Sequence, residues 1–237
     1  MKLSDKRWLA IQEAQRREIE QLSRDPDFAA RMSRKSYFSR IGSWITPDYH
    51  RVLELGCGPG RYVAMLSSVG HQVVGVDPCS YPDWAVFRSP NVDCRSEVYA
   101  EDLPFEDKAF DAVACMGALL YFKDPGKALS EVRRVLKPGG RIVVRTVNRN
   151  NLYTRSTGLP LDAQAPNLYS RDELVRLLSD GGFNVIDTFT YGFYPPAAHG
   201  TWWYLSNVVL PIDIQKILSD LTPVDRRVTI NAFAERA

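Results

Sequence analysis

The stretch VLELGCGPGRY at residues 52–62 constrains the fold of this chain more than any other. A short apolar run passes directly into a turn that holds Gly56, Gly58 and Gly60. Without Cβ atoms, such residues let the backbone turn sharply and let a ligand lie against it. A helix that begins after the turn would point its unpaired N–H groups at the same place, which suits an anionic or carboxylate-bearing ligand. The stretch predicts a nucleotide-type site, although a turn of this kind can also use glycine for geometry alone.

An acidic residue follows the turn at the distance expected for a strand–helix–strand unit. The helix RYVAMLSSVG is followed by the strand HQVVGVD, which ends at Asp77, about 20 residues after Gly58. A carboxylate at this position accepts hydrogen bonds from the vicinal hydroxyls of a ribose; the other interpretation is a turn or helix-capping aspartate. Tyr81 and Trp84 then offer either a flat apolar wall for a purine ring or ordinary core packing.

The alternation of strands and helices continues through the middle of the chain. The segments are CRSEVYAEDLPF, FDAVACMGALLYFKDP, the helix GKALSEVRRVLKPGG and the strand RIVVRTVN, and we expect the KPGG at 137–140 to end the helix as a C-cap. Residues 50–148 resemble the class I S-adenosylmethionine-dependent methyltransferases, especially the subgroup that includes quinone-biosynthesis and many small-molecule methyltransferases. The motifs that agree in order and spacing are ELGCGPG, VVGVD, AEDLPF, FDAVACMGALLYFKDP and LKPGGRIVV.

The resemblance implies an α/β protein with one Rossmann-like, seven-stranded, mostly parallel sheet whose last strand is antiparallel. Within this single domain, residues 50–148 would form the cofactor-binding core. Two helices predicted within residues 1–46 would cap it, and the polar loop at 149–169 and an insertion at 194–227, between the last two strands, would lie on the substrate side. A helix with a capping box at Ser170 would follow that loop.

The resemblance also implies S-adenosylmethionine as the cofactor. Asp77 would bind the ribose hydroxyls, and Ala100 would offer a backbone N–H to the adenine. The residues that would lie along the methionine part are Gly56, Gly58 and Gly60.

Further cofactor contacts are expected at both ends of this core. Met116 would line the cofactor through its main chain. The family usually has Asp or Asn before the alanine of its AEDLPF-type motif, where this chain has Tyr99, so Glu101 or the next residue, Asp102, would take over the contact with the adenine amino group.

The predicted second helix, at 27–45, holds two more candidates for the cofactor site. Tyr37 and Arg40 lie near its end and would cap the ligand, unless they belong to a solvated face.

A dinucleotide-binding fold is the main alternative, because it also combines a glycine turn with an acid at the end of the second strand. Its GxGxxG fingerprint needs a glycine where this chain has Arg61. The LKPGG and DLPF motifs have no counterpart in that fold, so the spacing favours the methyltransferase.

Candidates for catalysis are few. Members of the subgroup often have two histidines where Leu120 and Tyr121 stand here, so a histidine base at that position is excluded. His199 is the one histidine within the insertion, and we take it as the first candidate for a general base, with Tyr121 and Tyr169 behind it. A lone loop histidine is more commonly a solvated residue.

The insertion also carries a group of aromatic residues. They fit core packing, a wall over an apolar acceptor, or a patch that seeks a membrane surface. These residues are Tyr194, Trp202, Trp203 and Tyr204.

Composition narrows the choice of partners. With 30 basic and 28 acidic residues, the net charge of +2 gives no electrostatic case for nucleic acid or an anionic membrane. The four cysteines include no CxxC pair, so neither a metal site nor a disulfide framework is indicated. The charged N-terminal stretch lacks the apolar core of a signal peptide and no apolar run reaches 18 residues, so we expect a cytoplasmic protein without stable membrane insertion.

The expected activity is methyl transfer to a small organic acceptor. Oxygen is favoured over nitrogen, because no carboxylate-lined pocket for an amine is visible in the sequence. A protein that binds the cofactor without catalysis, as a regulator or partner subunit, is the alternative from a different class.

Overall fold

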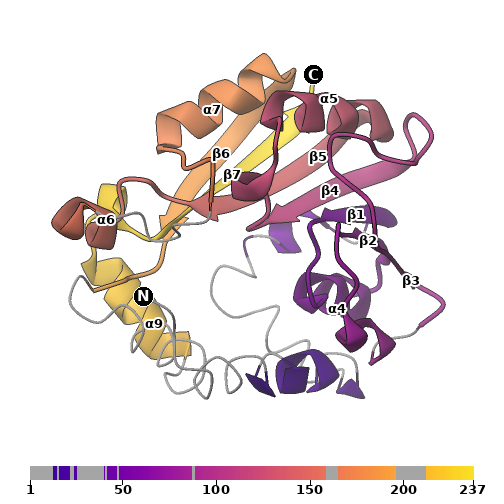
Figure 1. Ribbon diagram of the computed structural model, residues 1–237, viewed down its shortest axis with the longest axis horizontal. Helices are drawn as coiled ribbons and strands as arrows, with labels where there is room; N and C mark the ends of the chain where they lie inside the picture. The colour runs from indigo at the N-terminus through magenta and orange to yellow at the C-terminus, as the bar shows by residue number, and fades with distance from the viewer. Residues whose placement is uncertain are drawn as a thin grey trace.

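The computed structural model describes residues 13–14, 16–21, 24–25, 40, 42–46, 48–86, 89–158, 165–195 and 212–237, and every structural statement below concerns these residues. They form one sheet with helices on both faces (Figure 1).

Seven strands make up the sheet, in the order β3-β2-β1-β4-β5-β7-β6. The strands β1 to β5 run parallel to one another, and β7 runs antiparallel to both β5 and β6. This confirms the predicted seven-stranded, mostly parallel sheet with an antiparallel last strand. The bounds are β1 Arg51–Leu55, β2 Gln72–Val76, β3 Val92–Arg95, β4 Phe110–Met116, β5 Leu136–Val147, β6 Phe183–Tyr191 and β7 Thr229–Arg236.

Helices connect the strands and cover the sheet. Figure 1 shows α5 and α7 together on one face, with α4 below the sheet. The longer helices are α4 Arg61–Ser68, α5 Pro125–Val135, α7 Arg171–Asp180 and α9 Ile212–Leu221, and the short ones are α6 Leu152–Thr157, η1 Pro82–Ala85, η2 Leu119–Tyr121 and η4 Val224–Arg226.

Local sequence explains where the helices start. The side chain of Asp124 accepts a hydrogen bond from the Lys127 N–H and thereby caps α5, whose first residue is a proline. At α7, Ser170 and Glu173 form both halves of the predicted capping box.

The N-terminal segment packs on the α4 face of the sheet. Ile19 and Ile45 are fully buried there, in one cluster with residues of α4 and β1. The Glu18 carboxylate accepts a hydrogen bond from the Arg61 guanidinium at 2.7 Å, which joins this segment to the first turn of α4.

The LKPGG motif does not end a helix as a C-cap, which corrects that prediction. α5 ends at Val135, and the motif forms the first part of β5. The pairing of β4 with β5 shifts register there, from Phe110 opposite Leu136 to Ala112 opposite Arg141. The extra residues are accommodated because glycine occupies the tight position: a Cβ on Gly140 would lie 2.8 Å from the Lys137 carbonyl oxygen.

The segment after β5 that was predicted to be a polar loop begins with a short helix. It contains α6, which begins because the Asn151 side chain accepts a hydrogen bond from the Thr154 N–H. The second substrate-side segment, between β6 and β7, contains α9 and η4.

Candidate functional site

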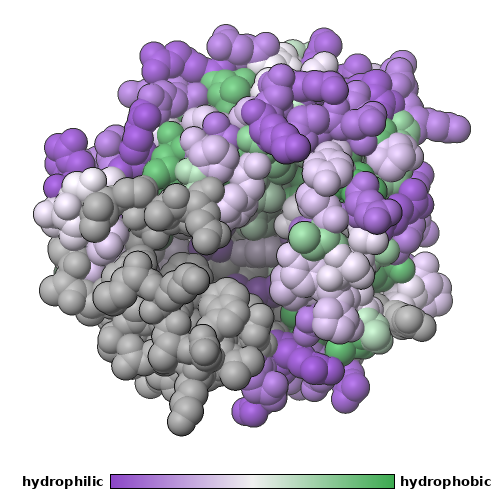
Figure 2. Space-filling view, viewed as in Figure 1, coloured by the Kyte–Doolittle hydropathy of each residue, from purple (hydrophilic) through white to green (hydrophobic). Residues whose placement is uncertain are grey.

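A cavity of about 390 Å³ lies at the carboxyl ends of β1, β2 and β4. Strand order reverses between β1 and β4, and open parallel sheets bind ligands at such a point. Figure 2 shows that the molecule is also hollowed near the middle of the viewed face. The residues that line the cavity are Leu55, Gly56, Gly58, Val76, Asp77, Pro78, Cys79, Tyr81, Val98, Tyr99, Ala100, Glu101, Gly117, Ala118, Tyr121, Phe122 and Lys123.

The three glycines of the turn have different structural roles. All three have positive φ angles, of 64°, 50° and 92° for Gly56, Gly58 and Gly60. A Cβ on Gly56 would lie 2.3 Å from the Cβ of Ala118, so that glycine is required for packing. A Cβ on Gly58 would meet nothing within 4 Å, so that glycine faces open space in the cavity wall. Gly60 is the N-cap of α4 and is not among the lining residues.

The Asp77 carboxylate is fixed in the wall of the cavity by two backbone hydrogen bonds. It accepts from the Gly58 N–H and from the Cys79 N–H, each at 2.9 Å, and the residue is only 8% exposed. A carboxylate has about four acceptor positions, so two remain for a ligand that offers paired hydroxyls. The geometry fits a ribose.

The glycine turn is braced from behind. The Trp84 indole N–H donates to the Gly58 carbonyl at 2.7 Å, and Trp84 lines a neighbouring cavity with Cys94. Tyr81 lines that neighbouring cavity too, but it also lines the main cavity, which Trp84 does not. Of the two aromatic residues considered for a purine wall, only Tyr81 is therefore in place.

The far end of the cavity holds the segment with Tyr99, where the family usually has Asp or Asn. Tyr99 is half-exposed in the wall, and the Lys123 ammonium lies 5.7 Å from the centroid of its ring. Glu101 also lines the cavity, but one of its oxygens accepts from the N–H groups of Lys123 and Asp124, at 2.8 and 3.2 Å. Glu101 thus holds the segment after η2 in place; Asp102 is not among the lining residues.

Arg134 fixes the DLPF loop beneath this end. Its guanidinium donates to the carbonyls of Leu103 and Phe105 at 2.9 and 2.6 Å, and to Glu131. The hydrogen bond from Arg134, together with the Leu103 N–H, holds the pKa of Glu131 below its usual value despite burial. The motif is therefore a structural support for the segment that carries Tyr99.

Besides Gly60, two more predicted cofactor residues lie outside the cavity lining. Met116 ends β4, and the next two residues, Gly117 and Ala118, form the wall. The Arg40 guanidinium bonds to Asp187 at 2.8 Å and lies 4.1 Å from the centroid of the Phe189 ring, both on β6 at the far edge of the sheet. The structure does not bring Arg40 to the cavity, and Tyr37 lies outside the described residues.

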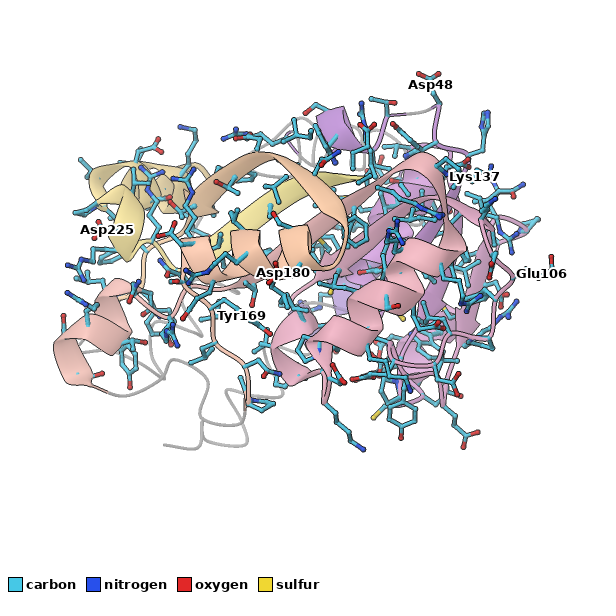
Figure 3. All side chains as sticks on the ribbon, turned by 90° about the horizontal axis from the view of Figure 1, so that it is seen from above. Asp48, Glu106, Lys137, Tyr169, Asp180 and Asp225 are labelled. Atoms are coloured by element: carbon cyan, nitrogen blue, oxygen red, sulfur yellow. The ribbon has the colours of Figure 1, made fainter. Side chains whose placement is uncertain are left out.

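The catalytic candidates are separated. Tyr121 lies in the cavity wall and is half-exposed. Tyr169 lies on the loop before α7 (Figure 3), forms a bridge with Asn148 and does not line the cavity. Burial, with smaller contributions from Cys115 and Glu173, raises the pKa of Tyr169 to about 12. A phenol with such a pKa donates hydrogen bonds and is a poor base at neutral pH.

Two of the three histidines are remote from the cavity. His50 and His71 precede β1 and β2, at the amino ends of the strands. His199 lies outside the described residues, as do Trp202, Trp203 and Tyr204, so its role remains a prediction.

The two segments predicted for the substrate side pack on each other at the carboxyl end of β5. The buried Asn148 side chain donates to the carbonyls of Asp225 and Arg227 at 3.1 and 2.9 Å. Farther out, the rings of Tyr153 and Tyr194 meet edge to face, with centroids 5.7 Å apart. Figure 1 shows α6 and α9 gathered at this end of the sheet.

Sequence reasoning missed several residues of the wall. Gly117, Phe122 and Lys123 all belong to the segment that follows β4. Their position after a buried parallel strand was a usable signal, because the loops at carboxyl ends form the site in such sheets.

Within the described part of the chain, no group of three or more His, Cys, Asp or Glu side chains is arranged to hold a metal ion. The helices described there are all too short or too polar to cross a membrane.

Comparison with known proteins assigns this arrangement to a family. Residues 53–144 match the methyltransferase domain family. A protein of Mycolicibacterium smegmatis, named a probable S-adenosylmethionine-dependent methyltransferase, is 35% identical over 141 residues, which cover 58% of this chain and 53% of that protein. The O-methyltransferase cnsE of Penicillium expansum is 33% identical over 158 residues, which cover 62% of this chain and 57% of that protein. The chain thus spans little more than half the length of these relatives.

A solved structure supports the fold over a longer stretch. The crystal structure of an S-adenosylmethionine-dependent methyltransferase from Mesorhizobium loti has a TM-score of 0.63 and 15% identity, and the match covers 84% of this chain and 97% of that one. Residues 53–144 of the chain therefore form a methyltransferase domain, similar to that of S-adenosylmethionine-dependent methyltransferases.

Proposed function

We propose that the protein transfers a methyl group from S-adenosylmethionine to a small organic acceptor, at an oxygen atom. The observation that carries this proposal is the cavity at the carboxyl ends of β1, β2 and β4, with Asp77 fixed in its wall and Gly58 facing its open space.

The chain's own residues would bind and orient the cofactor. Asp77 would accept hydrogen bonds from both ribose hydroxyls, and Gly58 would let the backbone lie against the ligand. Tyr81 and Tyr99 offer ring faces to the adenine end, where the usual acidic acceptor is missing. The bound cofactor supplies a sulfonium methyl group that is already a strong electrophile.

With such a donor, the remaining task is to place the acceptor atom in line and to exclude water. The packed segments around Asn148, Tyr153 and Tyr194 would enclose the acceptor at the end of β5. The Penicillium expansum relative is named an O-methyltransferase, which supports oxygen as the acceptor atom. A small amine is the alternative acceptor.

A general base is needed for a hydroxyl acceptor unless that hydroxyl is already ionised. Among the candidates, the raised pKa of Tyr169 argues against that residue. We propose His199 as the base on sequence grounds, with Tyr121 as the second candidate. Replacing His199 with Ala should lower the methylation rate by roughly 100-fold and leave cofactor affinity unchanged, as measured by rate assays and calorimetry. A rate within about threefold of wild type would exclude it as the base.

The direct test is transfer of label from methyl-labelled S-adenosylmethionine into an extract of small metabolites. Methyl transfer predicts a labelled product that disappears with Asp77→Ala. Tight cofactor binding without any labelled product, across hydroxylated and amine pools, would favour the alternative of a non-catalytic cofactor-binding regulator.

A further inference from the structure

Two cysteines from separate elements meet beneath the glycine turn. Cys57 lies within the turn and is buried, and Cys94 lies on the edge strand β3 and is half-buried. Gly75 of β2 pairs in register with Cys94, and a Cβ on Gly75 would lie 3.0 Å from the Cys57 Sγ. Because Gly75 has no side chain, the Cys57 thiol packs over it and lies next to Cys94 on the neighbouring strand, in one buried cluster.

The two thiols differ in accessibility. Cys94 lines a second cavity, of about 340 Å³, together with Tyr81 and Trp84, so a small solute can reach it from that side. Cys57 is only 6% exposed. The neighbouring Cys94 thiol and burial both raise the pKa of the Cys57 thiol. Because Cys94 faces a cavity and Cys57 does not, a peroxide meets Cys94 first.

We propose that Cys57 and Cys94 form an oxidation-sensitive pair, at which a peroxide produces a disulfide that weakens cofactor binding. In the first step the Cys94 sulfur attacks the peroxide O–O bond, becomes a sulfenic acid and releases hydroxide, which takes the thiol proton and becomes water. In the second step the Cys57 sulfur attacks the sulfenic sulfur, the S–S bond forms and a second water leaves. The two thiols together lose two electrons, and the peroxide gains them.

The consequence for the cofactor site follows from the position of Cys57. A disulfide holds its sulfurs about 2 Å apart, closer than two thiols that are only in contact, so we expect the turn to shift toward β3 when the bond forms. The next residue, Gly58, donates its N–H to Asp77 and accepts from the Trp84 indole, and both contacts depend on the position of the turn. We expect cofactor affinity to fall at least about tenfold on oxidation, since a charge-assisted hydrogen bond is disturbed in the binding wall.

One experiment tests the formation of the disulfide and its effect on cofactor binding separately. Reduced protein is treated with hydrogen peroxide, digested without reductant and mapped by mass spectrometry, and S-adenosylmethionine binding is titrated before oxidation, after it, and after dithiothreitol. We expect a peptide pair joined through Cys57 and Cys94, lighter than the separate peptides by two hydrogens, and reversible loss of affinity. The mapping does not depend on the proposed function, and only the affinity arm uses the proposed cofactor site.

Matched variants identify the pair. Cys94→Ser, with Cys94→Ala as a second variant on the same edge strand, should give no linked peptide and keep its affinity after peroxide. Cys79→Ser should still form the link, because Cys79 lies outside the pair. Absence of the linked peptide from oxidised wild type would overturn the proposal, as would an equal loss of affinity in Cys94→Ser. A link that forms without any change in affinity would overturn the proposed effect on cofactor binding.

Discussion

Replacing Asp77 with Ala tests the proposed cofactor site most directly. The wild-type carboxylate already accepts two backbone hydrogen bonds, from Gly58 and Cys79, so about two of its acceptor positions remain for a ligand. If both ribose hydroxyls occupy them, the variant loses two charge-assisted hydrogen bonds. Allowing for partial replacement by water, the loss is about 2 to 4 kcal/mol of cofactor binding free energy. At 1.4 kcal/mol for each factor of ten, affinity should fall roughly 30- to 700-fold.

Isothermal titration with S-adenosylmethionine measures this loss, and circular dichroism checks that the variant is folded. Asp77→Asn adds a graded comparison: it keeps the size of the side chain but loses the charge and one acceptor oxygen, so a smaller loss is expected. Asp93→Ala is the matched control, because Asp93 lies on the neighbouring strand β3 and bonds to Arg95 at 2.7 Å, away from the cavity lining.

The Ala variant addresses two roles at once, since it also leaves the N–H groups of Gly58 and Cys79 without their acceptor. A purely structural role predicts a lower free energy of unfolding with unchanged affinity in the folded fraction. An affinity for S-adenosylmethionine within about threefold of wild type would therefore remove Asp77 from the binding site and refute the assignment of the ribose to this wall.

Three further predictions follow from single positions. Gly58→Val should abolish cofactor binding with the circular dichroism spectrum retained, whereas Gly56→Ala should destabilise the fold because its new Cβ would meet Ala118 at 2.3 Å; equal loss of folding in both would contradict their different roles. Burial lowers the pKa of His71, so the stability that its neutral form provides is present above about pH 6.5 and is lost as the pH falls through the lowered value. In urea titrations, His71→Gln should therefore lose less free energy of unfolding between about pH 7 and 5 than wild type does. The same dependence on pH in both proteins would exclude the effect. Arg134→Lys should lower the free energy of unfolding by about 1 to 3 kcal/mol in the same assay, because a lysine cannot reach two carbonyls and a carboxylate together, and a loss below about 0.5 kcal/mol would argue against a supporting role.

The part of the site that could be predicted from sequence is the part built by local backbone geometry. A glycine turn after a buried strand and an acid about 20 residues later mark the carboxyl ends of two neighbouring parallel strands. These two positions are therefore expected to lie side by side. Gly58 and Asp77 accordingly lie in one wall. Side-chain roles were less predictable, because they depend on contacts distant in sequence. Trp84 was a candidate purine wall, yet its indole binds the back of the turn, and Arg40 was a candidate cap, yet it pairs with Asp187 across 147 positions.

LKPGG illustrates a different limit. A Pro-Gly-Gly run after a helix favours a helix stop by its local preferences. In this fold the same glycines belong to the strand that follows. A Cβ on Gly140 would lie only 3.0 Å from the Asp111 carbonyl oxygen, so the strand needs glycine at this position. The same Pro-Gly-Gly run is compatible with the end of a helix and with a bulged strand. Only the pairing of β4 with β5 decides between these two structures.

The proposed acceptor side is built by side-chain contacts between residues that are distant in sequence, and Asn148 is an example. This residue directly follows the last strand of the matched family segment, so the cofactor-binding fold determines its position. Its side chain then bonds to the Arg227 carbonyl, 79 positions later, and its own carbonyl accepts from the Asn151 side chain at 2.6 Å, next to α6. Because both of the segments proposed to enclose the acceptor are held at this one residue, we expect a change in either segment to alter that enclosure without moving the cofactor wall. Under the proposed function, the acceptor is therefore set by these two segments and not by the motifs of the cofactor wall.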